Sequence, residues 1–465
     1  MDEVIASVEP ALRAKIGAYR REHRLPGIVA GVASRHGLAW WHANGFADIE
    51  AGRRGDERTL HRVASITKTV TATAVMQLRE AGAFRLDDPA IRFIPELERL
   101  VNAHGSLDDL SIRRLLMHTS GLQGELPWQD LDRFWFYRPD QLGEILHLGA
   151  VRTLPEAGYK YSNFAYELLG LLVERVAGTD FVEHLRTSIL DPLGMADTTW
   201  FPDADQAARR AVGYDARAHD DTPRRAKNLD DGLFLADGGL WSTAEDLGRW
   251  IGHQLRADAS AERGEGQVLA GRTLVEMHRP TWIVDAKWTE AQGLGWFATR
   301  KGEMILVGHA GSLHGFQSCI AFSATARLGV VVLLNGIGNA TKLAQGLMET
   351  LLPAASEAED RAEVEPFKPV PEAWRELLGA YRDPEFGDDL LVEWRDGRLI
   401  ARDTEDDAED RELRPTDDPL VFTVTGGRHD AEALAFSRGA DGRVDRTNLA
   451  GYPLIRVDLV RDPVE

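Results

Sequence analysis

Apolar positions at the start of the chain follow a helical period and then change to continuous runs. In residues 4–22 an apolar residue recurs at every third or fourth position, which predicts an amphipathic helix. Its apolar stripe is formed by Ile5, Val8, Leu12, Ile16 and Tyr19. Pro26-Gly27 ends the pattern, and the runs 28–33 and 38–41 predict two strands that form a hairpin around Arg35-His36-Gly37.

Runs typical of strands return only late in the chain. They occupy Met304–Gly308, Phe316–Ser323 and Leu328–Asn335, and a helix is predicted around 341–352. The stretch between the early hairpin and these late strands, about 65–255, consists mostly of predicted helical segments and long polar loops. We therefore predict an α/β fold in which both ends of residues 1–352 build one antiparallel sheet, sandwiched by helices, with a helical region inserted between the two ends.

The pattern changes again after residue 352. Residues 353–372 are rich in proline and acidic residues, a composition that suits an exposed linker. Residues 373–465 carry short alternating runs separated by Asp-Gly and Gly-Gly turns, which predict a small antiparallel β-barrel or curved sheet. The expected domains are therefore 1–352, a linker over 353–372, and 373–465.

Charge and composition narrow the possible partners. The chain has 465 residues and a formal net charge of −20, so nucleic acid and anionic membrane surfaces would repel it. No apolar run reaches the length of a membrane span, and the first residues lack the pattern of a signal peptide, so we expect a cytoplasmic protein unless a signal precedes this sequence. The single cysteine, Cys319, excludes an internal disulfide and is expected to be an inert core thiol.

A candidate nucleophile stands at the head of an apolar helical run. Ser65 and Lys68 are three residues apart, so on a helix they share one face with their Cβ atoms about 5–6 Å apart. A serine in the first helical turn also lies near free backbone N–H groups and the positive end of the helix dipole. The spacing indicates a serine that a lysine could activate.

Two later motifs support this hypothesis. Tyr161-Ser162-Asn163 precedes a predicted helix, and His309-Ala310-Gly311-Ser312 lies at the end of a predicted strand. The order S-x-x-K, Y-S-N and H-x-G resembles serine β-lactamases and penicillin-binding proteins. The tyrosine of the second motif makes residues 10–352 similar to the class C β-lactamase branch, with its D-aminopeptidases and carboxylesterases. The C-terminal part resembles, more weakly, the lipocalin-like barrel appended to some members.

The resemblance implies a role for each motif residue. Ser65 would be the nucleophile, Lys68 and Tyr161 would share the proton it loses, and Asn163 would orient Lys68 and the substrate amide. The backbone N–H groups of Ser65 and Ser312 would form the oxyanion hole, with Gly311 in the same substrate-binding segment.

The state of Lys68 sets a requirement on its surroundings. A lysine with an ordinary pKa of about 10.4 must be held neutral near pH 7 to act as a base. We expect burial and nearby positive charge to do this.

The third motif departs from the family pattern at its first position. Most β-lactamases have a lysine there that helps to hold the substrate carboxylate, whereas this chain has His309. Since the ordinary pKa of histidine is about 6.5, we expect carboxylate affinity to rise as the pH falls through that value. The change favours a peptidase, amidase or esterase, acting on D-amino-acid peptides or small esters, over a true β-lactamase.

Alternatives remain at several residues. A β-lactamase, or a sensor module that is acylated without turnover, is the alternative function. His118 is expected to support a loop. The aromatic run Phe134–Tyr137, with Trp128, is assigned to the core or the acyl pocket. The histidine spacing predicts no metal site. We also expect no cofactor and a substrate that is a small molecule or a peptide. The sequence leaves open whether the protein is a homo-oligomer.

Overall fold

The chain folds into two compact units. The computed structural model describes residues 2–125, 146–217, 222–227, 235–257, 267–362, 368–395, 397–404 and 410–457. Contacts divide the chain into Met1–Ala358 and Glu359–Glu465, and each unit is considered by itself below. The aromatic residues Trp128 and Phe134–Tyr137 lie outside the described residues.

The first unit is organised by a nine-stranded antiparallel sheet in the order β10-β11-β12-β13-β14-β15-β1-β2-β3. Its strands are β1 (Gly27–Ser34), β2 (Gly37–Asp48), β3 (Arg53–Arg54), β10 (Trp282–Ile283), β11 (Glu290–Gln292), β12 (Phe297–Lys301), β13 (Met304–Leu313), β14 (Phe316–Ser323) and β15 (Leu328–Leu334). The early strand β1 pairs with the late strand β15, with Ile28 opposite Leu334. The prediction of one sheet built from both ends of this unit is confirmed.

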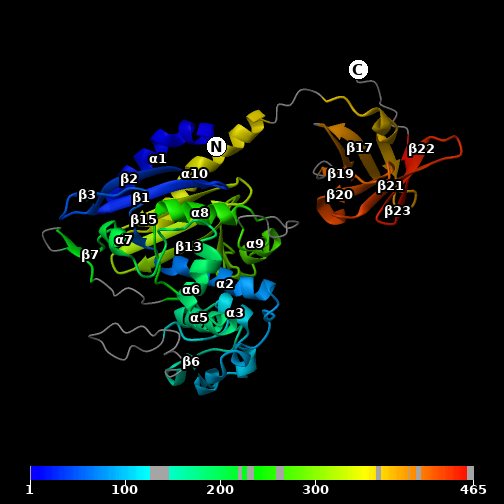
Figure 1. Cartoon of the computed structure of the whole chain (residues 1–465). Helices are drawn as coiled ribbons and strands as arrows, with labels where there is room; N and C mark the ends of the chain where they lie inside the picture. Colours follow the sequence, from blue (N-terminus) through cyan, green and yellow to red (C-terminus); the bar gives the residue numbers. More distant parts are fainter. Residues whose placement is uncertain are drawn as a thin grey trace. The chain divides into compact units, whose positions relative to one another are not determined.

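Two terminal helices cover one face of this sheet. Figure 1 shows α1 (Asp2–Glu22) and α10 (Ala340–Ala362) together on that face. Leu12 and Ile16 of α1 pack with Leu343, Leu347 and Leu351 of α10 in one buried cluster with the sheet.

The helix α10 runs farther than the sequence indicated. It continues through Pro353, so the prediction that the helix ends at residue 352 is wrong. A proline inside a helix costs about 3 kcal/mol or more because it removes a backbone hydrogen bond. The helix nevertheless continues past the proline, and the buried Ala355 in this part packs in the cluster on the sheet.

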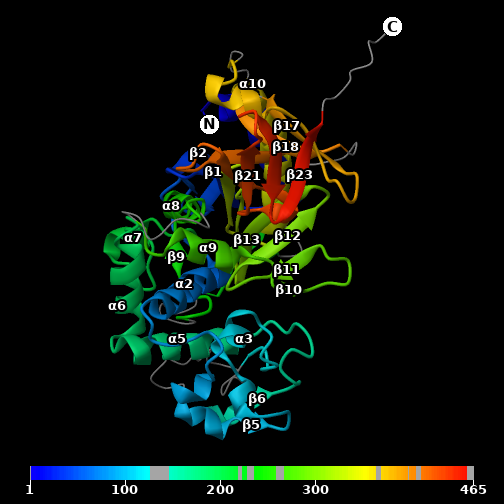
Figure 2. The same ribbon diagram turned by 90° about the vertical axis from the view of Figure 1, so that its right-hand side faces the viewer.

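Helical segments cover the opposite face and build the inserted region, as Figures 1 and 2 show. They are α2 (Thr67–Glu80), α3 (Ile112–Leu116), α5 (Asn163–Ala177), α6 (Phe181–Leu185), α7 (Ala204–Ala208), α8 (Ala244–Gln254) and α9 (Gly271–His278). Short strand pairs join this region: β4 (His61–Arg62) with β9 (Trp241–Ser242), β5 (Val101–Asn102) with β6 (Ala150–Val151), and β7 (Tyr214–Arg217) with β8 (Pro223–Arg225). Within the described ranges, no helix combines the length and apolar character that a membrane crossing requires.

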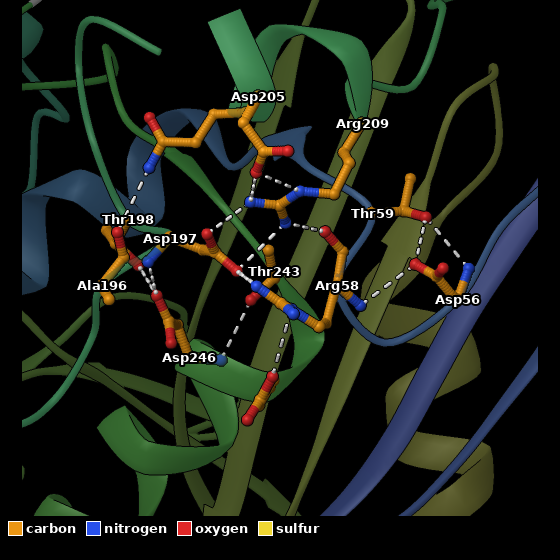
Figure 3. A network of polar contacts seen from close by, with 12 residues as sticks. Asp56, Arg58, Thr59, Ala196, Asp197, Thr198, Asp205, Arg209, Thr243 and Asp246 are labelled. Atoms are coloured by element: carbon orange, nitrogen blue, oxygen red, sulfur yellow. Dashed lines mark hydrogen bonds and ion pairs between the residues drawn. The ribbon is translucent and has the colours of Figure 1, made fainter. Parts of the chain in front are cut away.

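A polar network fixes the segment that leads into the candidate nucleophile (Figure 3). Asp197 accepts hydrogen bonds from Arg58 at 3.2 Å and from Arg209 at 2.5 Å. The buried carboxyl of Asp246, in the first turn of α8, accepts from the backbone N–H of Asp197 at 2.8 Å and from the hydroxyl of Thr198 at 2.9 Å. The segment before β4 is thus fastened to the start of α8.

The second unit is a closed antiparallel barrel of eight strands. The strands are β16 (Gly379–Arg382), β17 (Asp389–Arg395), β18 (Arg398–Asp403), β19 (Arg411–Pro415), β20 (Val421–Thr425), β21 (Ala433–Arg438), β22 (Val444–Leu449) and β23 (Tyr452–Val457). Leucine, valine and aromatic side chains fill its interior, with Phe422 and Phe436 in edge-to-face contact. Closure leaves no unpaired sheet edge, and the predicted small barrel is confirmed.

Candidate active site

Ser65 lies in a tight turn at the start of a helix. The turn is the 3-10 helix η1 (Ala64–Ile66), and α2 begins directly after it. Ala64 has a φ of +46°, a left-handed conformation that is uncommon for a residue with a Cβ. The Thr67 hydroxyl donates to the Ala64 carbonyl at 2.7 Å and holds the turn. Ser65 is therefore presented at the N-terminal end of α2, as its position in the sequence predicted.

Lys68 lies directly beneath Ser65 and is completely buried. Its Nζ is 3.0 Å from Ser65 Oγ and donates to the backbone carbonyl of Asp237 at 2.7 Å. Its Nζ is also 3.6 Å from Oδ2 of Asp237. Burial is as expected, but the expectation of nearby positive charge is wrong, because the charged side chain next to Lys68 is an acid.

Asp237 was not found by sequence analysis. It lies just before β9, and its side chain is 3% exposed. Burial raises the pKa of Asp237 to about 7, although the charge of Lys68 acts in the opposite direction. The sequence signal was limited to the neighbouring Gly238-Gly239-Leu240, which marks a turn but not the side chain that faces the lysine.

Tyr161 approaches Lys68 from the segment before α5. Ser162 caps this helix, with its hydroxyl accepting from the Ala165 N–H at 3.0 Å, and so places Tyr161 just outside the first turn. The centre of the Tyr161 ring is 5.1 Å from Lys68 Nζ. The first two motifs therefore meet around one amine, as the resemblance implied.

His118 holds the Tyr161 segment in place. Its Nδ1 accepts the Ser162 N–H at 3.1 Å, and its ring stacks on the Tyr161 ring with a centroid distance of 4.2 Å. Burial lowers the pKa of His118 well below its usual value, so the ring is neutral and carries its proton on Nε2. The stacking on Tyr161 is an addition to the loop-supporting role expected from the sequence.

Asn163 makes a contact that the sequence did not indicate. Its Nδ2 donates to Oε1 of Glu125, and its buried Oδ1 has no hydrogen-bond partner among the described residues. No hydrogen bond joins Asn163 to Lys68 in the described part of the chain. The expected role of Asn163 in orienting Lys68 is therefore not supported by a direct contact. Burial raises the pKa of Glu125.

The third motif passes directly over the nucleophile turn. A Cβ on Gly311 of β13 would lie 2.1 Å from the Val63 carbonyl oxygen and 3.0 Å from the Ser65 nitrogen. Only glycine allows this approach. The Ser318 hydroxyl of β14 donates to the same Val63 carbonyl at 2.7 Å. The strand and the turn are thus locked together, and Ser65 and Ser312 line one cavity.

His309 belongs to the same strand, β13, and its side chain is buried, with 3% of the residue exposed. Its Nδ1 donates to the Ala310 carbonyl at 2.7 Å, and its ring meets the edge of Phe297 with a centroid distance of 5.3 Å. Burial, aided by the charge of Lys68, lowers the pKa of His309 to about 3. The expectation that His309 gains charge near pH 6.5 is therefore wrong, because its side chain lies inside the protein.

The motifs open onto a cavity of about 570 Å³. Its walls include Ser65, Tyr161 and Asn163 on one side and Leu306, Ile320 and Cys319 from the sheet. Its lining, as far as the chain is described, contains one carboxylate, Glu290, and no lysine or arginine. Burial raises the pKa of the Cys319 thiol to about 12, in keeping with an inert thiol.

No cluster of three or more metal-ligating side chains occurs in the described parts of the chain. Around Ser65 the site contains a serine, a lysine, a tyrosine and backbone N–H groups. It can supply a nucleophile, a proton acceptor and an oxyanion site.

Comparison with known proteins identifies the larger unit. Residues 12–352 match the family model Beta-lactamase. Protein flp of Staphylococcus aureus strain MRSA252 is 25% identical over 63% of this chain and 56% of its own length. Protein Rv1367c of Mycobacterium tuberculosis is 33% identical over 49% of this chain and 61% of its own length. The matches thus span little more than half of each curated relative.

Solved structures extend the likeness to the fold. The octameric penicillin-binding protein homologue from Pyrococcus abyssi has a TM-score of 0.64 at 21% identity, covering 96% of this chain and 99% of that one. A D-stereospecific amidohydrolase from Streptomyces sp. has a TM-score of 0.60 at 23% identity, covering 72% of this chain and 96% of that one. At these identities the likeness shows the fold alone.

Proposed function

Because the chain belongs to the β-lactamase family, we propose that it is a serine hydrolase that cleaves amide or ester bonds through an acyl-enzyme. The observation that carries this proposal is the 3.0 Å distance between Ser65 Oγ and the buried Lys68 Nζ. A serine hydroxyl is a weak nucleophile until a neighbouring base removes its proton, and this distance is within reach of that transfer.

The proposed reaction has two steps. Ser65 Oγ bonds to the substrate carbonyl carbon while its proton passes to Lys68, directly or through the Tyr161 hydroxyl. The oxyanion is stabilised by the N–H groups of Ser65 and Ser312, each contributing roughly 3 kcal/mol. The bond to the leaving amine or alcohol then breaks, and the leaving group takes the proton. A water molecule, deprotonated by the same pair, then bonds to the acyl carbon. The ester bond to Ser65 Oγ breaks, and Oγ takes the proton back.

The charge of the cavity supports a substrate without a carboxylate near the scissile bond. Its described lining holds Glu290 and no arginine or lysine, and His309 is neutral. A β-lactam carboxylate would meet no fixed positive charge there. We therefore propose neutral or amine-bearing amides, such as D-amino-acid peptides, or small esters. The Streptomyces protein of similar fold is a D-stereospecific amidohydrolase, which supports the amide choice.

A substrate panel tests this function. The panel contains p-nitrophenyl esters, D-amino-acid p-nitroanilides and a chromogenic cephalosporin, each followed for a burst and for steady-state turnover. We expect turnover of an ester or anilide and little with the cephalosporin. Ser65→Ala should abolish turnover and labelling by a fluorophosphonate probe, whereas Ser312→Ala, which keeps the backbone N–H, should still be labelled. Labelling that survives in Ser65→Ala would overturn the assignment, and a stoichiometric burst without turnover would identify a sensor module instead.

We also propose that the protein is a homo-oligomer, since the Pyrococcus abyssi homologue is described as octameric. Light scattering of the purified protein measures its mass directly. A mass equal to that of one chain would contradict this proposal.

A further inference from the structure

The segment that carries Asp237 is fastened to the nucleophile helix at two successive residues. The Thr71 hydroxyl donates to the Ala236 carbonyl at 2.7 Å, and Lys68 Nζ donates to the Asp237 carbonyl at 2.7 Å. Upstream, the indole N–H of Trp200 donates to the Leu235 carbonyl at 2.7 Å. Asp237 is therefore held beneath Lys68 by its own backbone, independently of its carboxyl group.

The contacts of the Asp237 carboxyl do not resemble those of a tight ion pair. Its Oδ2 is 3.6 Å from Lys68 Nζ, whereas charge-assisted N–H···O bonds are about 2.7–2.9 Å long. Its Oδ1 is buried and has no hydrogen-bond partner among the described residues. A buried carboxylate with an unsatisfied oxygen is costly, and protonation of the group removes that cost.

The other charged groups near this pair are also acidic. The charge of Glu125 adds to the effect of burial in raising the pKa of Asp237, and the pKa of Glu167 is raised well above its usual value by burial and by the charges of Asp237 and Glu125. His118 and His309 face Lys68 as neutral rings. Tyr161 and Tyr166 face it with their rings, 5.1 and 5.6 Å from Nζ. Several carboxyls thus surround a single amine, which favours a proton on at least one carboxyl.

We propose that Lys68 and Asp237 share one proton, and that the Asp237 carboxyl holds it in the resting enzyme so that the Lys68 amine offers its lone pair to Ser65. The inference rests on the proposed hydrolase function. The transfer breaks one N–H bond of Lys68 and forms an O–H bond on Oδ2, so the net charge of the pair stays zero. It requires Nζ and Oδ2 to approach to hydrogen-bond length. The amine then accepts the Ser65 proton and later returns it to the leaving group.

In this arrangement Asp237 acts through Lys68 and does not touch the substrate, so it is a positioning residue. The sequence led us to expect that a nearby positive charge keeps Lys68 neutral. In this proposal Asp237 does so instead, by accepting the proton of Lys68. Because the two groups interact strongly, the pKa values seen in a titration belong to the pair and not to either residue.

The pH profile of kcat/KM in Asp237→Asn tests the inference. An asparagine is neutral, like the protonated Asp237 that it replaces, so Lys68 should bind its extra proton at nearly the same pH in the variant as in the wild type. The acidic limb of the profile should therefore stay within about half a pH unit of its wild-type position, which is a change of kcat/KM below the limb of about threefold at most. If Asp237 were only the anion of an ion pair, its removal would make Lys68 easier to deprotonate and the limb would move to lower pH. A shift of about one unit or more in either direction overturns the inference.

Two further variants provide controls. Asp237→Glu keeps an acid and should likewise leave the acidic limb near its wild-type position. Asp246→Asn alters another buried aspartate, which hydrogen-bonds Thr198 and not Lys68, and should leave the limb unchanged. Thermal unfolding of each variant checks that it is folded.

An infrared measurement on the unmodified protein covers the case in which Asp237→Asn does not fold or the enzyme shows no turnover. A protonated buried carboxyl gives a C=O band distinct from that of a carboxylate. We expect this band at neutral pH in the wild type and also in Lys68→Met, where Asp237 keeps its proton without its partner. A band that gains intensity in Lys68→Met would mean that Asp237 is a carboxylate in the wild type, and it overturns the inference. Failure of the hydrolase proposal would instead appear as absent turnover and absent labelling of Ser65 in the wild type.

Discussion

The floor of the site beneath Ser65 and the interior of the C-terminal barrel are both buried, but they are built from opposite kinds of side chain. Beneath Ser65 lie Lys68, Asp237 and His118, all almost without solvent exposure. The barrel is filled by residues such as Phe422 and Phe436. Apolar burial stabilises a fold by about 25 cal/mol per Å², whereas buried charges carry a desolvation penalty. The barrel interior is thus suited to stability, and the floor of the site to chemistry.

Unsatisfied polar atoms follow the same division. Buried side-chain atoms without a partner in the described residues include His118 Nε2, Asn163 Oδ1 and Asp237 Oδ1 around the site, but only Arg411 Nε in the barrel. Such atoms are unfavourable unless a substrate, water or proton satisfies them. Other such atoms lie elsewhere in the first unit, but the three around Ser65 are placed where a substrate or a proton can satisfy them.

The largest effect, in free energy, is expected in the barrel. Phe422→Ala removes a fully packed ring and should lower the free energy of unfolding of that unit by about 3–5 kcal/mol. Urea unfolding followed by tryptophan fluorescence measures this, with Phe422→Leu as a milder control. A loss below about 1 kcal/mol would mean that the barrel interior repacks freely and that the contrast with the site floor is weaker than described.

The next largest effect is a loss of catalytic rate at the site. Lys68→Ala and Tyr161→Phe should each lower kcat by at least about a hundredfold, or roughly 2.7 kcal/mol of transition-state stabilisation. The double variant should lose little more than either single one, because the pair works as a unit. Steady-state kinetics with the best substrate of the panel measures both.

A matched tyrosine in the barrel serves as the control. The buried Tyr381 hydroxyl donates to the Leu377 carbonyl at 2.8 Å, so Tyr381→Phe removes the same atom in an apolar setting. It should change stability by about 1 kcal/mol and leave kcat as in the wild type. Equal kinetic losses in Tyr161→Phe and Tyr381→Phe would contradict the assignment of Tyr161 to the chemistry.

The effect that is smallest near neutral pH concerns acid. Because the pKa of His309 is lowered to about 3, the folded protein binds fewer protons than the unfolded chain between about pH 3 and the ordinary histidine value near 6.5. The stability that this gives is full above pH 6.5 and is lost as the pH falls toward 3, by up to about 1.4 kcal/mol per pH unit. In His309→Gln this loss is absent, so the free energy of unfolding of the first unit should fall less steeply with acid.

The same variant checks the activity. Between pH 5 and 8 the neutral His309 has no charge to lose, so the pH dependence of kcat/KM in His309→Gln should match the wild type. A profile that changes near pH 6.5 would show that His309 titrates in the working enzyme.

Local patterns predicted much of this molecule. The continuous apolar run of β1 indicated a strand, and the S-x-x-K spacing placed Ser65 and Lys68 on one face of a helix, because both patterns depend on the backbone nearby. Asp237 could not be assigned from the sequence, since it reaches Lys68 from far along the chain. The pKa of His309 was missed for a related reason: burial is decided by tertiary packing, not by neighbouring residues. Pro353 was read as a stop because local propensity ignores the sheet that the helix covers.

The place of β1 in the sheet has a consequence for the order of events during synthesis. This strand pairs on one side with β2, which follows it directly in the sequence. On the other side it pairs with β15, which is translated only near the end of the first unit. A two-stranded hairpin alone is marginal, so β1 waits until residue 334 has left the ribosome. The turn that carries Ser65 waits as well, because β13 and β14 lock it through Gly311 and Ser318. The nucleophile is therefore expected to be among the first functional elements translated and among the last to be assembled, so that a nascent or truncated chain carries no working site.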